Sequence, residues 1–330
     1  MEFAQSSLEG VAMNLLSKRV LVTGGTGFIG SHLVEELVQQ GAIVTVTSLF
    51  QQDNRSYFYQ KGLDKKVTVV QVDVANFYSL FDLVARHEIE FIFHLAAQPL
   101  VEVALKSPRS TLETNINGTI NVLECLRMLT QIKGVIVASS DKAYGKHGKE
   151  KYVETDCLKG DHPYEVSKSA ADLICTSYIN TYKLPIIITR FGNVYGEGDQ
   201  NYSRIIPGIM RALVEKRSFN IRSDGTFTRD YVYVKDVVKG YLSLVKNFES
   251  CRGQVFNFGG LQTLSVIELV NRVSKALKVR INFIIENTSQ NEIFHQSLDS
   301  TKVTLATGWK PKVKIESVCK KILKYYVSIL

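Results

Sequence analysis

The chain has 330 residues, of which 45% are hydrophobic and 22% are charged, and its formal net charge is +8. This length allows one large domain or two modest ones with a sizeable core. The hydrophobic fraction excludes an intrinsically disordered chain. No apolar run approaches the roughly 20 residues of a transmembrane helix, so a membrane protein is excluded too.

The start of the chain, residues 1–17, is expected to be a tail that precedes the fold, and Met13 is an alternative start. The tail lacks the basic-then-apolar order of a signal peptide. The cysteines are odd in number and well separated, which argues against a disulfide framework and a zinc site: Cys125, Cys157, Cys175, Cys251 and Cys319. We therefore expect a reduced, cytoplasmic compartment and no metal.

Much of the positive charge lies between Lys302 and Lys324, which hold seven lysines and one glutamate. The simplest interpretation is a solvated helical face with its flanks. No module of interleaved aromatic and basic residues accompanies the charge, so we expect no nucleic-acid partner. A phosphate-rich small ligand would also suit a basic chain.

Apolar β-branched runs alternate with helical patterns over the first 190 residues. The expected strands are Arg19–Thr23, Ile43–Val46, Val67–Val72, Phe91–Leu95, Gly134–Ser139 and Pro185–Arg190. The expected helices follow Gly30 up to Gly41, and then span Phe77–Arg86, Thr111–Met128 and Tyr164–Thr181. Such alternation indicates βαβ units and a mostly parallel sheet covered on both faces.

The residue composition changes after residue 190: Gly, Asn, Tyr and Arg cluster in residues 192–204 and 222–230. Helices are expected over Ile205–Lys216, Val234–Lys246 and Ser265–Leu277, with a strand over Val255–Phe258. We expect a dinucleotide-binding domain over residues 18–190, with some later segments. A smaller substrate-binding lobe is expected over most of 191–330.

The segment Thr23–Gly30 reads Thr-Gly-Gly-Thr-Gly-Phe-Ile-Gly and lies between the first strand and a helix. Glycine lets the backbone turn tightly and approach a pyrophosphate, and the helix N-terminus offers free N–H groups. A glycine triplet alone also occurs in ordinary tight turns. The order strand, loop, helix favours a dinucleotide site.

The G-x-x-G-x-x-G spacing resembles the extended short-chain dehydrogenases/reductases that act on nucleotide sugars, and this resemblance extends over about residues 18–311. It implies a Rossmann-type doubly wound α/β sheet that binds NAD. It also implies a set of cofactor residues: Gly24, Gly27, Phe28, Ile29, Gly30, Ser48, Asp73, Val74, Leu95, Ala96, Ala97, Tyr164 and Lys168.

The end of the second strand reads Thr47-Ser48-Leu49 and lacks the acid that would accept hydrogen bonds from the ribose of NAD. Arg55 follows and could reach a 2′-phosphate, although a solvated loop residue is the simpler interpretation. NAD is favoured, and NADP stays open.

Tyr164 and Lys168 form a Y-x-x-x-K pattern, and residues four apart share one face of a helix. The lysine charge is expected to lower the pKa of the tyrosine, which would then take a proton from a sugar hydroxyl. The pattern is common by chance. It gains weight from its place after a glycine-loop domain and before a strand.

Ser140-Asp141-Lys142 follows another strand and resembles the Asp-Lys variant of CDP-glucose 4,6-dehydratases. The resemblance implies that Ser140 bonds the reacting oxygen. Elimination of water across C5 and C6 needs an acid and a base. We expect Asp141 to be the acid, with a raised pKa, and Lys142 the base, with a lowered one. The plainer alternatives are that Asp141 is a helix cap or turn residue and that Lys142 is a solvated charge.

The resemblance also implies a set of substrate-binding residues: Gln98, Asn193, Arg204, Arg222 and Arg229. Guanidinium groups suit a diphosphate, although each arginine alone could equally form a structural salt bridge. Many relatives carry a second phosphate-binding arginine near a segment that here reads His295-Gln296-Ser297-Leu298. The phosphate contacts are therefore expected to be redistributed.

Three functions stay open from the sequence. The main hypothesis is a nucleotide-diphosphate-hexose 4,6-dehydratase. A nucleotide-sugar 4-epimerase would share the loop, Tyr164 and Lys168, and a silent NAD-binding regulator would need no catalytic residues.

The resemblance also implies a homodimer that packs the helices Thr111–Met128 and Tyr164–Thr181 of the two subunits together. In the first of these helices, four side chains form an apolar stripe: Leu112, Ile116, Ile120 and Leu123. Glu197 is the alternative base if Lys142 is not.

Overall fold

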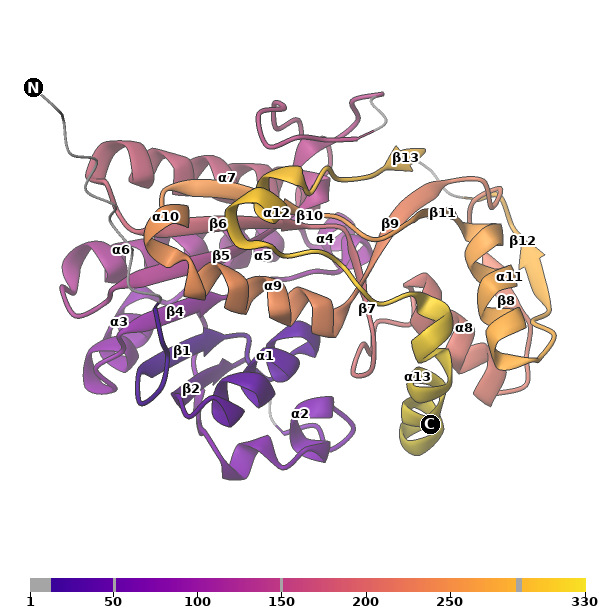
Figure 1. Cartoon of the computed structure of the whole chain (residues 1–330), viewed down its shortest axis with the longest axis horizontal. Coiled ribbons are helices and arrows are strands. Elements are labelled where there is room, and N and C mark those ends of the chain that lie inside the picture. Colours follow the sequence, from indigo (N-terminus) through magenta and orange to yellow (C-terminus); the bar gives the residue numbers. More distant parts are fainter. Residues whose placement is uncertain (1–12, 50–51, 149–150, 289–292) are drawn as a thin grey trace, which may run out of the picture.

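The computed structural model describes residues 13–330 except 50–51, 149–150 and 289–292. Its centre is a seven-stranded parallel sheet of order β10-β6-β5-β4-β1-β2-β3 (Figure 1). The strands are β1 (Arg19–Thr23), β2 (Ile43–Ser48), β3 (Thr68–Gln71), β4 (Phe91–His94), β5 (Gly134–Ser140), β6 (Ile186–Phe191) and β10 (Gln254–Phe258). The predicted doubly wound α/β fold is confirmed.

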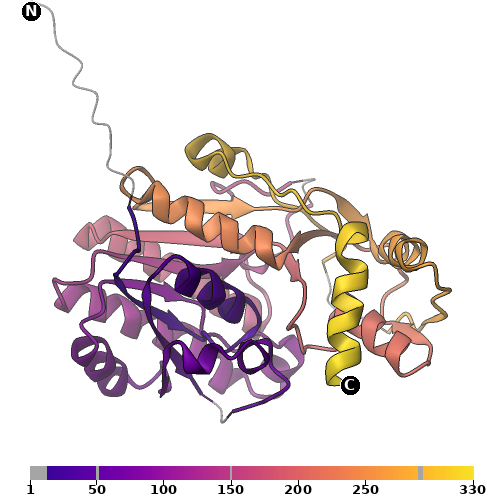
Figure 2. The ribbon, with the colours of Figure 1, turned by 60° about the horizontal axis from the view of Figure 1, so that its bottom comes forward.

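Helices cover both faces of this sheet (Figures 1 and 2). One face packs on α1 (Phe28–Gln39) and α9 (Val234–Lys246), and the other on α3 (Phe77–Arg86), α6 (Gly118–Met128) and α7 (Pro163–Tyr182). The inner strands bury both sides, as their unbroken apolar sequences predicted. The edge strand β3 departs from this, since its side chains are mostly exposed and Val69 is 36% exposed.

The long helix predicted over Thr111–Met128 is divided into three. After α4 (Val101–Lys106), the chain forms α5 (Pro108–Leu112), the π-helical turn η2 (Glu113–Asn117) and then α6. A π-turn shifts the face that the following residues present. Leu123 is consequently buried in the core, whereas Leu112, Ile116 and Ile120 are only half-buried.

The beginning of the fold also differs from the prediction. Residues 1–12 of the predicted tail lie outside the described residues. Leu15, placed in that tail, is 3% exposed and packs in the main core, and the Ser17 N–H donates to the Gly41 carbonyl over 2.9 Å. The tail therefore does not reach residue 17, because Leu15 has core neighbours that the sequence could not indicate.

The second part of the chain builds two smaller sheets beside the main one. In the larger, β9 (Thr228–Tyr233) pairs with β7 (Asn193–Tyr195), β11 (Thr263–Ser265) and β13 (His295–Gln296), and β8 (Phe219–Ile221) pairs with β12 (Phe283–Ile285). The cluster of Gly, Asn, Tyr and Arg over 222–230 thus enters a strand at Thr228. β9 is internal, because β11 and β13 flank it, and Asp230 is buried there despite its charge.

Three helices pack around a separate core in this region: α8 (Ile205–Val214), α11 (Val266–Leu277) and α13 (Ile315–Ile329). Ser265 caps α11 through a complete capping box with Glu268, so the helix starts one residue after the predicted boundary. Figure 2 shows α13 beside this part of the molecule. The remaining helical pieces are α2 (Tyr57–Gln60), η1 (Leu63–Lys65), η3 (Asp141–Tyr144), α10 (Phe248–Cys251) and α12 (Thr301–Thr307).

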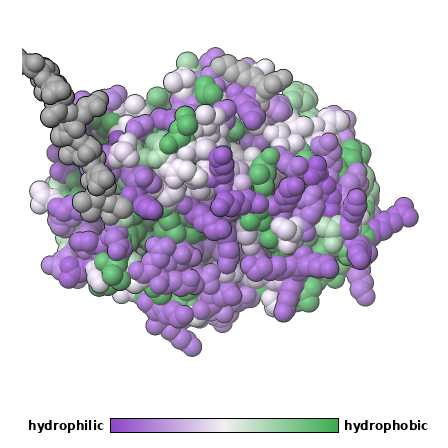
Figure 3. Space-filling model, in the orientation of Figure 1, coloured by the Kyte–Doolittle hydropathy of each residue, from purple (hydrophilic) through white to green (hydrophobic). Residues whose placement is uncertain are grey.

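The face of the molecule seen in Figure 3 is mostly hydrophilic, and its apolar patches are small and scattered. Among the residues that the structure describes, no helix combines the length and apolar character needed to cross a membrane.

Candidate functional site

Two glycines of the loop after β1 lie too close to other backbone atoms to carry a side chain. Gly24 has a φ of +68°, and a Cβ there would lie 2.9 Å from the Ala96 backbone. A Cβ on Gly30 would lie 2.3 Å from the Gly24 carbonyl oxygen. The loop therefore brings its backbone against the end of β4 and directs the first N–H groups of α1, at Phe28 and Ile29, toward the same edge. This cradle fits a pyrophosphate.

The end of β2 lies beside that loop. Ser48 is 8% exposed, and its hydroxyl accepts a hydrogen bond from Thr26 over 3.2 Å. Arg55 pairs with Asp53 over 3.1 Å and is largely exposed. Its guanidinium thus already has an anionic partner in its own loop, as the simpler interpretation expected.

The segment after β3 places Asp73 on the surface and Val74 in the interior. One carboxylate oxygen of Asp73 accepts the Ala75 N–H over 2.9 Å, which fixes the turn. A Cβ on Gly118 would lie 2.7 Å from Val74, so α6 approaches this turn closely.

The end of β4 is fixed by a buried polar chain. The Thr23 hydroxyl accepts the N–H groups of Leu95 and Ala96, each over 3.2 Å, and lies 2.8 Å from His94 Nδ1. Burial lowers the pKa of His94 to about 3, so the ring is neutral at physiological pH. Leu95–Ala97 therefore holds a defined position beside Gly24.

Ser140, Asp141 and Tyr164 meet where β5 ends. The Ser140 hydroxyl lies 3.0 Å from an Asp141 carboxylate oxygen, and it also hydrogen-bonds the Tyr164 hydroxyl. The Ser140 Oγ accepts the Lys142 N–H over 3.2 Å, which starts the short helix η3. A hydroxyl thus links a carboxyl and a phenol at the carboxyl edge of the parallel sheet, where open α/β sheets bind ligands.

Asp141 is 4% exposed, and burial raises the pKa of its carboxyl. The charges of Lys142 and Arg229 and the bond from Ser140 oppose this shift. The raised pKa agrees with the direction expected for an acid. Lys142 is half-buried next to it.

Lys168 lies one turn after Tyr164 on α7 and is 8% exposed. Its Nζ donates to the Ala138 carbonyl over 3.0 Å, and burial lowers the pKa of Lys168 to about 8. Burial raises the pKa of Tyr164, opposed by Arg204 and by the Ser140 bond. The expected lowering of the Tyr164 pKa is therefore wrong for this structure, because burial of the phenol dominates.

Two residues that the sequence did not single out hold this edge together. Asn115, in the π-turn η2, accepts the Gln98 N–H over 2.7 Å and donates to Ser167 over 2.9 Å. Arg190 forms a buried bidentate pair with Asp172, both bonds being 2.8 Å, and donates to the Tyr144 hydroxyl over 2.7 Å. Tyr144 ends η3, so this pair positions the segment that carries Asp141 and Lys142.

The substrate residues predicted from the sequence have different surroundings. The Gln98 amide bonds Leu100 and Thr111, within its own loop and α5. Arg222 pairs with Glu102 of α4 over 2.8 Å, and both are exposed. Arg204 binds the buried Asp199 over 3.1 Å and, as its effect on Tyr164 shows, lies near the phenol.

Asn193 and Arg229 share one face of the smaller sheet. Asn193 pairs with Tyr231, two residues beyond Arg229 on β9, and alternate residues of a strand point to one side. The Asn193 Nδ2 is buried without a hydrogen-bond partner within the described part of the chain. Arg229 donates to the carbonyls of Thr228 and Phe294.

Glu197, the alternative base, is committed elsewhere. Its carboxylate lies 2.6 Å from the Lys321 ammonium on α13 and accepts the Tyr233 hydroxyl over 2.9 Å. The geometry of Glu197 thus does not support a role as the C5 base.

Over the described ranges, no group of three His, Cys, Asp or Glu side chains could hold a metal ion.

The family model described as GDP-mannose 4,6 dehydratase matches residues 21–322 of the chain. The chain belongs to this family. It is an NAD-dependent family of nucleotide-sugar dehydratases and epimerases, and so the expected resemblance to extended short-chain dehydrogenases/reductases is confirmed.

Relatives in this family differ in activity. The chain is 29% identical over 328 residues to a UDP-N-acetyl-alpha-D-glucosaminuronate decarboxylase of Bacillus cytotoxicus, covering 95% of this chain and 99% of that one. It is also 29% identical to the CDP-glucose 4,6-dehydratase of Salmonella typhimurium, covering 94% and 90%. These two relatives catalyse different reactions, so they do not show which reaction this chain catalyses.

Solved structures lead to the same conclusion. The UDP-glucose 4-epimerase of Thermotoga maritima, solved with UDP-glucose, has a TM-score of 0.84 at 27% identity, covering 94% of this chain and 99% of that one. The dTDP-glucose 4,6-dehydratase DesIV of Streptomyces venezuelae, solved with NAD, has a TM-score of 0.84 at 26% identity, covering 94% and 97%. The fold thus accommodates both an epimerase and a dehydratase.

Proposed function

We propose that the chain is an NAD-dependent nucleotide-sugar 4,6-dehydratase, a lyase that forms a 4-keto-6-deoxy sugar in the cytoplasm. The observation that carries the proposal is the buried Asp141, linked through Ser140 to Tyr164 and followed directly by Lys142. A 4-epimerase needs the phenol and the hydroxyl but needs no additional acid and base there. Asp141 and Lys142 thus favour the dehydratase.

NAD fits the glycine cradle, where a side chain on Gly24 or Gly30 would collide with backbone. When bound, NAD would supply a hydride acceptor for the oxidation at C4 and, once reduced, a hydride donor for C6. The cofactor residues would be the loop Gly24–Gly30, Ser48, Asp73, Val74 and Leu95–Ala97.

The protein side chains handle the protons. Tyr164 would take the proton of the C4 hydroxyl as a phenolate, the form that the charge of Arg204 favours against the effect of burial, and Ser140 would hold that oxygen through its own hydroxyl. Oxidation to a ketone makes the C5 proton acidic. Lys142 would then remove it as the base, while Asp141, whose protonated form burial favours, would protonate the departing C6 hydroxyl as the acid. Lys168 anchors α7 to β5 beneath Tyr164.

The substrate would be a nucleoside-diphosphate sugar. Arg229 and Asn193 occupy one face of the smaller sheet, and Arg204 lies near Tyr164. A guanidinium group can donate two parallel hydrogen bonds to one phosphate, so Arg229, Arg204 and Arg222 suit the diphosphate. Arg222 would exchange Glu102 for phosphate, whereas Gln98 would act by shaping its loop.

The test is a substrate panel with CDP-glucose, dTDP-glucose, GDP-mannose and UDP-N-acetylglucosamine. We expect one of them to yield a 4-keto-6-deoxy product, identified by mass spectrometry as a loss of water. If the best substrate changes only its configuration at C4, the 4-epimerase is the correct function. If none turns over while NAD stays bound, the chain is an NAD-binding regulator.

We also expect a homodimer. Leu173 on α7 is 57% exposed, and Val103 and Leu105 on the neighbouring α4 are 38% and 58% exposed. Together with the half-buried Leu112 and Ile116, these side chains would pack against a second copy of the chain. Light scattering at micromolar concentration should give twice the chain mass, and a monomer mass would contradict the expectation.

A further inference from the structure

The lysines toward the end of the chain are a sequence feature that the proposed function leaves unused. Together, α9 and the segment 309–330 contain nine lysines, two acids and no arginine. All nine lysines are exposed, and we name them the lysine face: Lys235, Lys239, Lys246, Lys310, Lys312, Lys314, Lys320, Lys321 and Lys324.

A buried carboxylate holds the loop before α13 against the start of α9. Asp236, in the first turn of α9, accepts the N–H groups of Lys312 and Val313, each over 2.8 Å. The Trp309 indole N–H donates to the Asp236 carbonyl over 2.9 Å. The Lys239 ammonium lies 3.9 Å from the same carboxylate. The lysines of this loop are therefore fixed beside those of α9.

The helix α13 joins the same place. The Lys321 ammonium donates to the hydroxyl of Tyr233, the residue directly before α9, over 3.3 Å. Figures 1 and 2 both show α13 close to that end of α9. Lys320 and Lys324 are four residues apart and share the exposed stripe of α13. Two helices and the loop between α12 and α13 thus form one continuous lysine surface.

The acids of these segments, and of the helix α1 that packs on α9, are less accessible than the lysines. Asp236 and Glu197 are 1% and 3% exposed. Glu316 on α13, and Glu35 and Glu36 on α1, are half-buried. None of these five acids is exposed, whereas all nine lysines are. The charge that this surface presents to solvent is therefore positive.

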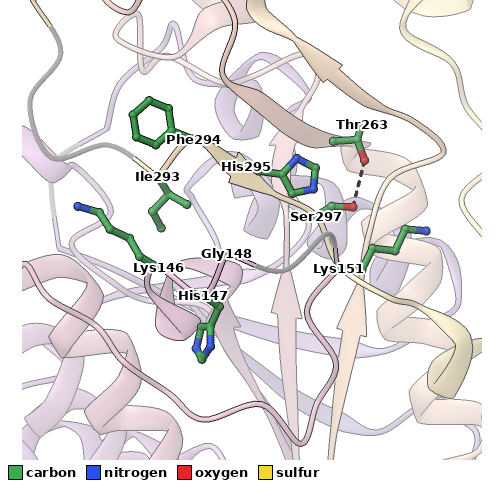
Figure 4. Close-up of a pocket in the computed structure, with 9 residues that line it drawn as sticks. All are labelled: Lys146, His147, Gly148, Lys151, Thr263, Ile293, Phe294, His295 and Ser297. Atoms are coloured by element: carbon green, nitrogen blue, oxygen red, sulfur yellow. Dashed lines mark hydrogen bonds between the residues drawn. The ribbon is translucent and has the colours of Figure 1, made fainter.

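Two other lysines belong to a different region. Lys146 and Lys151 line a cavity of about 550 Å³ beside β13 (Figure 4). His295 also lines it and bonds Thr228, the neighbour of Arg229, over 2.5 Å. This cavity adjoins the proposed substrate residues, and none of the nine lysines is among the described residues that line it.

The composition of the lysine face favours a lipid surface over a nucleic acid. Arginine, with its planar fork, suits directed phosphate contacts, whereas the lysine ammonium is a compact point charge. The large aromatic side chains of these segments are buried and offer no ring for a base to stack on: Trp309, Tyr241, Tyr325 and Tyr326.

An aliphatic side chain also lies on this surface. Val327 is 61% exposed and shares the stripe of Lys320 and Lys324 on α13. Such a side chain gains nothing from a phosphate backbone. It gains from the apolar zone just below lipid headgroups, where amphipathic helices place their apolar residues.

We propose that the lysine face binds the anionic surface of a lipid bilayer, with the exposed stripe of α13 on the headgroups. Clusters of roughly four to eight basic residues are typical of sites for anionic lipids, and this association needs no membrane-spanning helix. The expected homodimer uses α4 and α7, and α7 covers the face of the main sheet opposite α9, so a second copy leaves the lysine face open. The proposal does not depend on which reaction the chain catalyses.

The experiment is co-sedimentation of the full chain with lipid vesicles. One set is pure phosphatidylcholine, and the other contains equal parts of phosphatidylcholine and phosphatidylglycerol. We expect binding to the anionic vesicles to be at least roughly tenfold tighter, since each lysine near the surface adds to the attraction. Added salt should release the chain, because it screens these charges.

The triple variant Lys235→Gln, Lys320→Gln, Lys324→Gln should weaken binding to the anionic vesicles by roughly 100-fold, since three charges leave the surface. It spares Lys321, which pairs with the buried Glu197. Thermal unfolding checks that the variant is folded.

The matched control removes three exposed lysines next to helices of the opposite face: Lys106→Gln, Lys133→Gln, Lys183→Gln. It lowers the net charge equally and should bind the anionic vesicles within roughly threefold of the unaltered chain, because these lysines are not on the docking surface. Val327→Ser should weaken vesicle binding by roughly threefold to tenfold, because an apolar contact is lost without any change in charge.

Three results would overturn the proposal. The first is equal binding to both kinds of vesicle, or to neither. The second is an equal loss in the triple variant and its matched control, since net charge alone would then explain the binding. The third is displacement from the vesicles by a short DNA duplex together with unchanged vesicle binding by Val327→Ser, which would make a nucleic acid the partner. None of these results bears on the substrate panel, so the proposed dehydratase and the proposed membrane surface can fail separately.

Discussion

Replacing Lys142 by methionine should lower formation of the 4-keto-6-deoxy product by roughly 10²–10⁴-fold, the usual contribution of a general base. Methionine keeps the length of the side chain and removes the amine. Oxidation at C4 does not need this base, so reduced cofactor should accumulate and be visible by its absorbance. Product and reduced cofactor are measured in the same reaction.

Two other variants serve as comparisons for Lys142→Met. Asp141→Asn should also stop after the oxidation, because it cannot protonate the leaving hydroxyl. It should also stabilise the fold, since the buried carboxylate with its raised pKa makes the folded state less stable at pH values above that pKa. Tyr164→Phe should instead prevent the oxidation. Near-normal dehydration by Lys142→Met would show that the base lies elsewhere and that Lys142 is a loop charge.

The pH dependence of the elimination follows from Asp141. An acid acts only while it is protonated, so the elimination rate should fall as the pH rises through the raised pKa of this carboxyl. In Asp141→Asn this alkaline decline should disappear from the residual rate.

Asp172→Asn should destabilise the protein by about 3–5 kcal/mol, because it leaves the guanidinium of Arg190 buried without its anion. The two side chains are 0% and 4% exposed, and two bonds of 2.8 Å join them. Arg190 also donates to Tyr144 at the end of η3. Activity should therefore fall along with the free energy of unfolding, which urea denaturation measures.

An exposed ion pair provides the matched control for Asp172→Asn. Asp82 pairs with Arg86 over 2.7 Å, but these side chains are 54% and 76% exposed. Asp82→Asn should change the free energy of unfolding by less than about 1 kcal/mol, because solvent screens such pairs. A comparable loss in both variants would contradict the role that burial gives to Arg190 and Asp172.

Local sequence patterns predicted much of the main sheet. The apolar β-branched runs predicted all seven strands, and β1 agrees residue for residue. The glycine loop and the Tyr164–Lys168 spacing were equally readable, because turns and helix faces depend on residues only a few positions apart. The break of Thr111–Met128 at η2 was not, since a π-turn leaves no pattern that differs from an ordinary helix.

Side-chain environments were less accessible to prediction. The sequence indicated an acid at Asp141, and burial raises its pKa as expected. It also indicated that Lys168 would lower the pKa of Tyr164, whereas burial of the phenol raises it and Arg204 is the charge that opposes this. Arg204 lies 40 positions from Tyr164, and only the fold brings the two together.

By itself the sequence determined the strands, the parallel sheet and its cofactor loop, because strands, helices and the turns between them follow from local patterns. Only the tertiary structure decided which polar groups share a partner. The Glu197 carboxylate pairs with Lys321, Arg190 pairs with Asp172, and Lys146 and His295 line the same cavity. The physical reason is that burial and charge at these positions depend on residues from 18 to about 150 positions away, whose placement follows from how the whole chain packs.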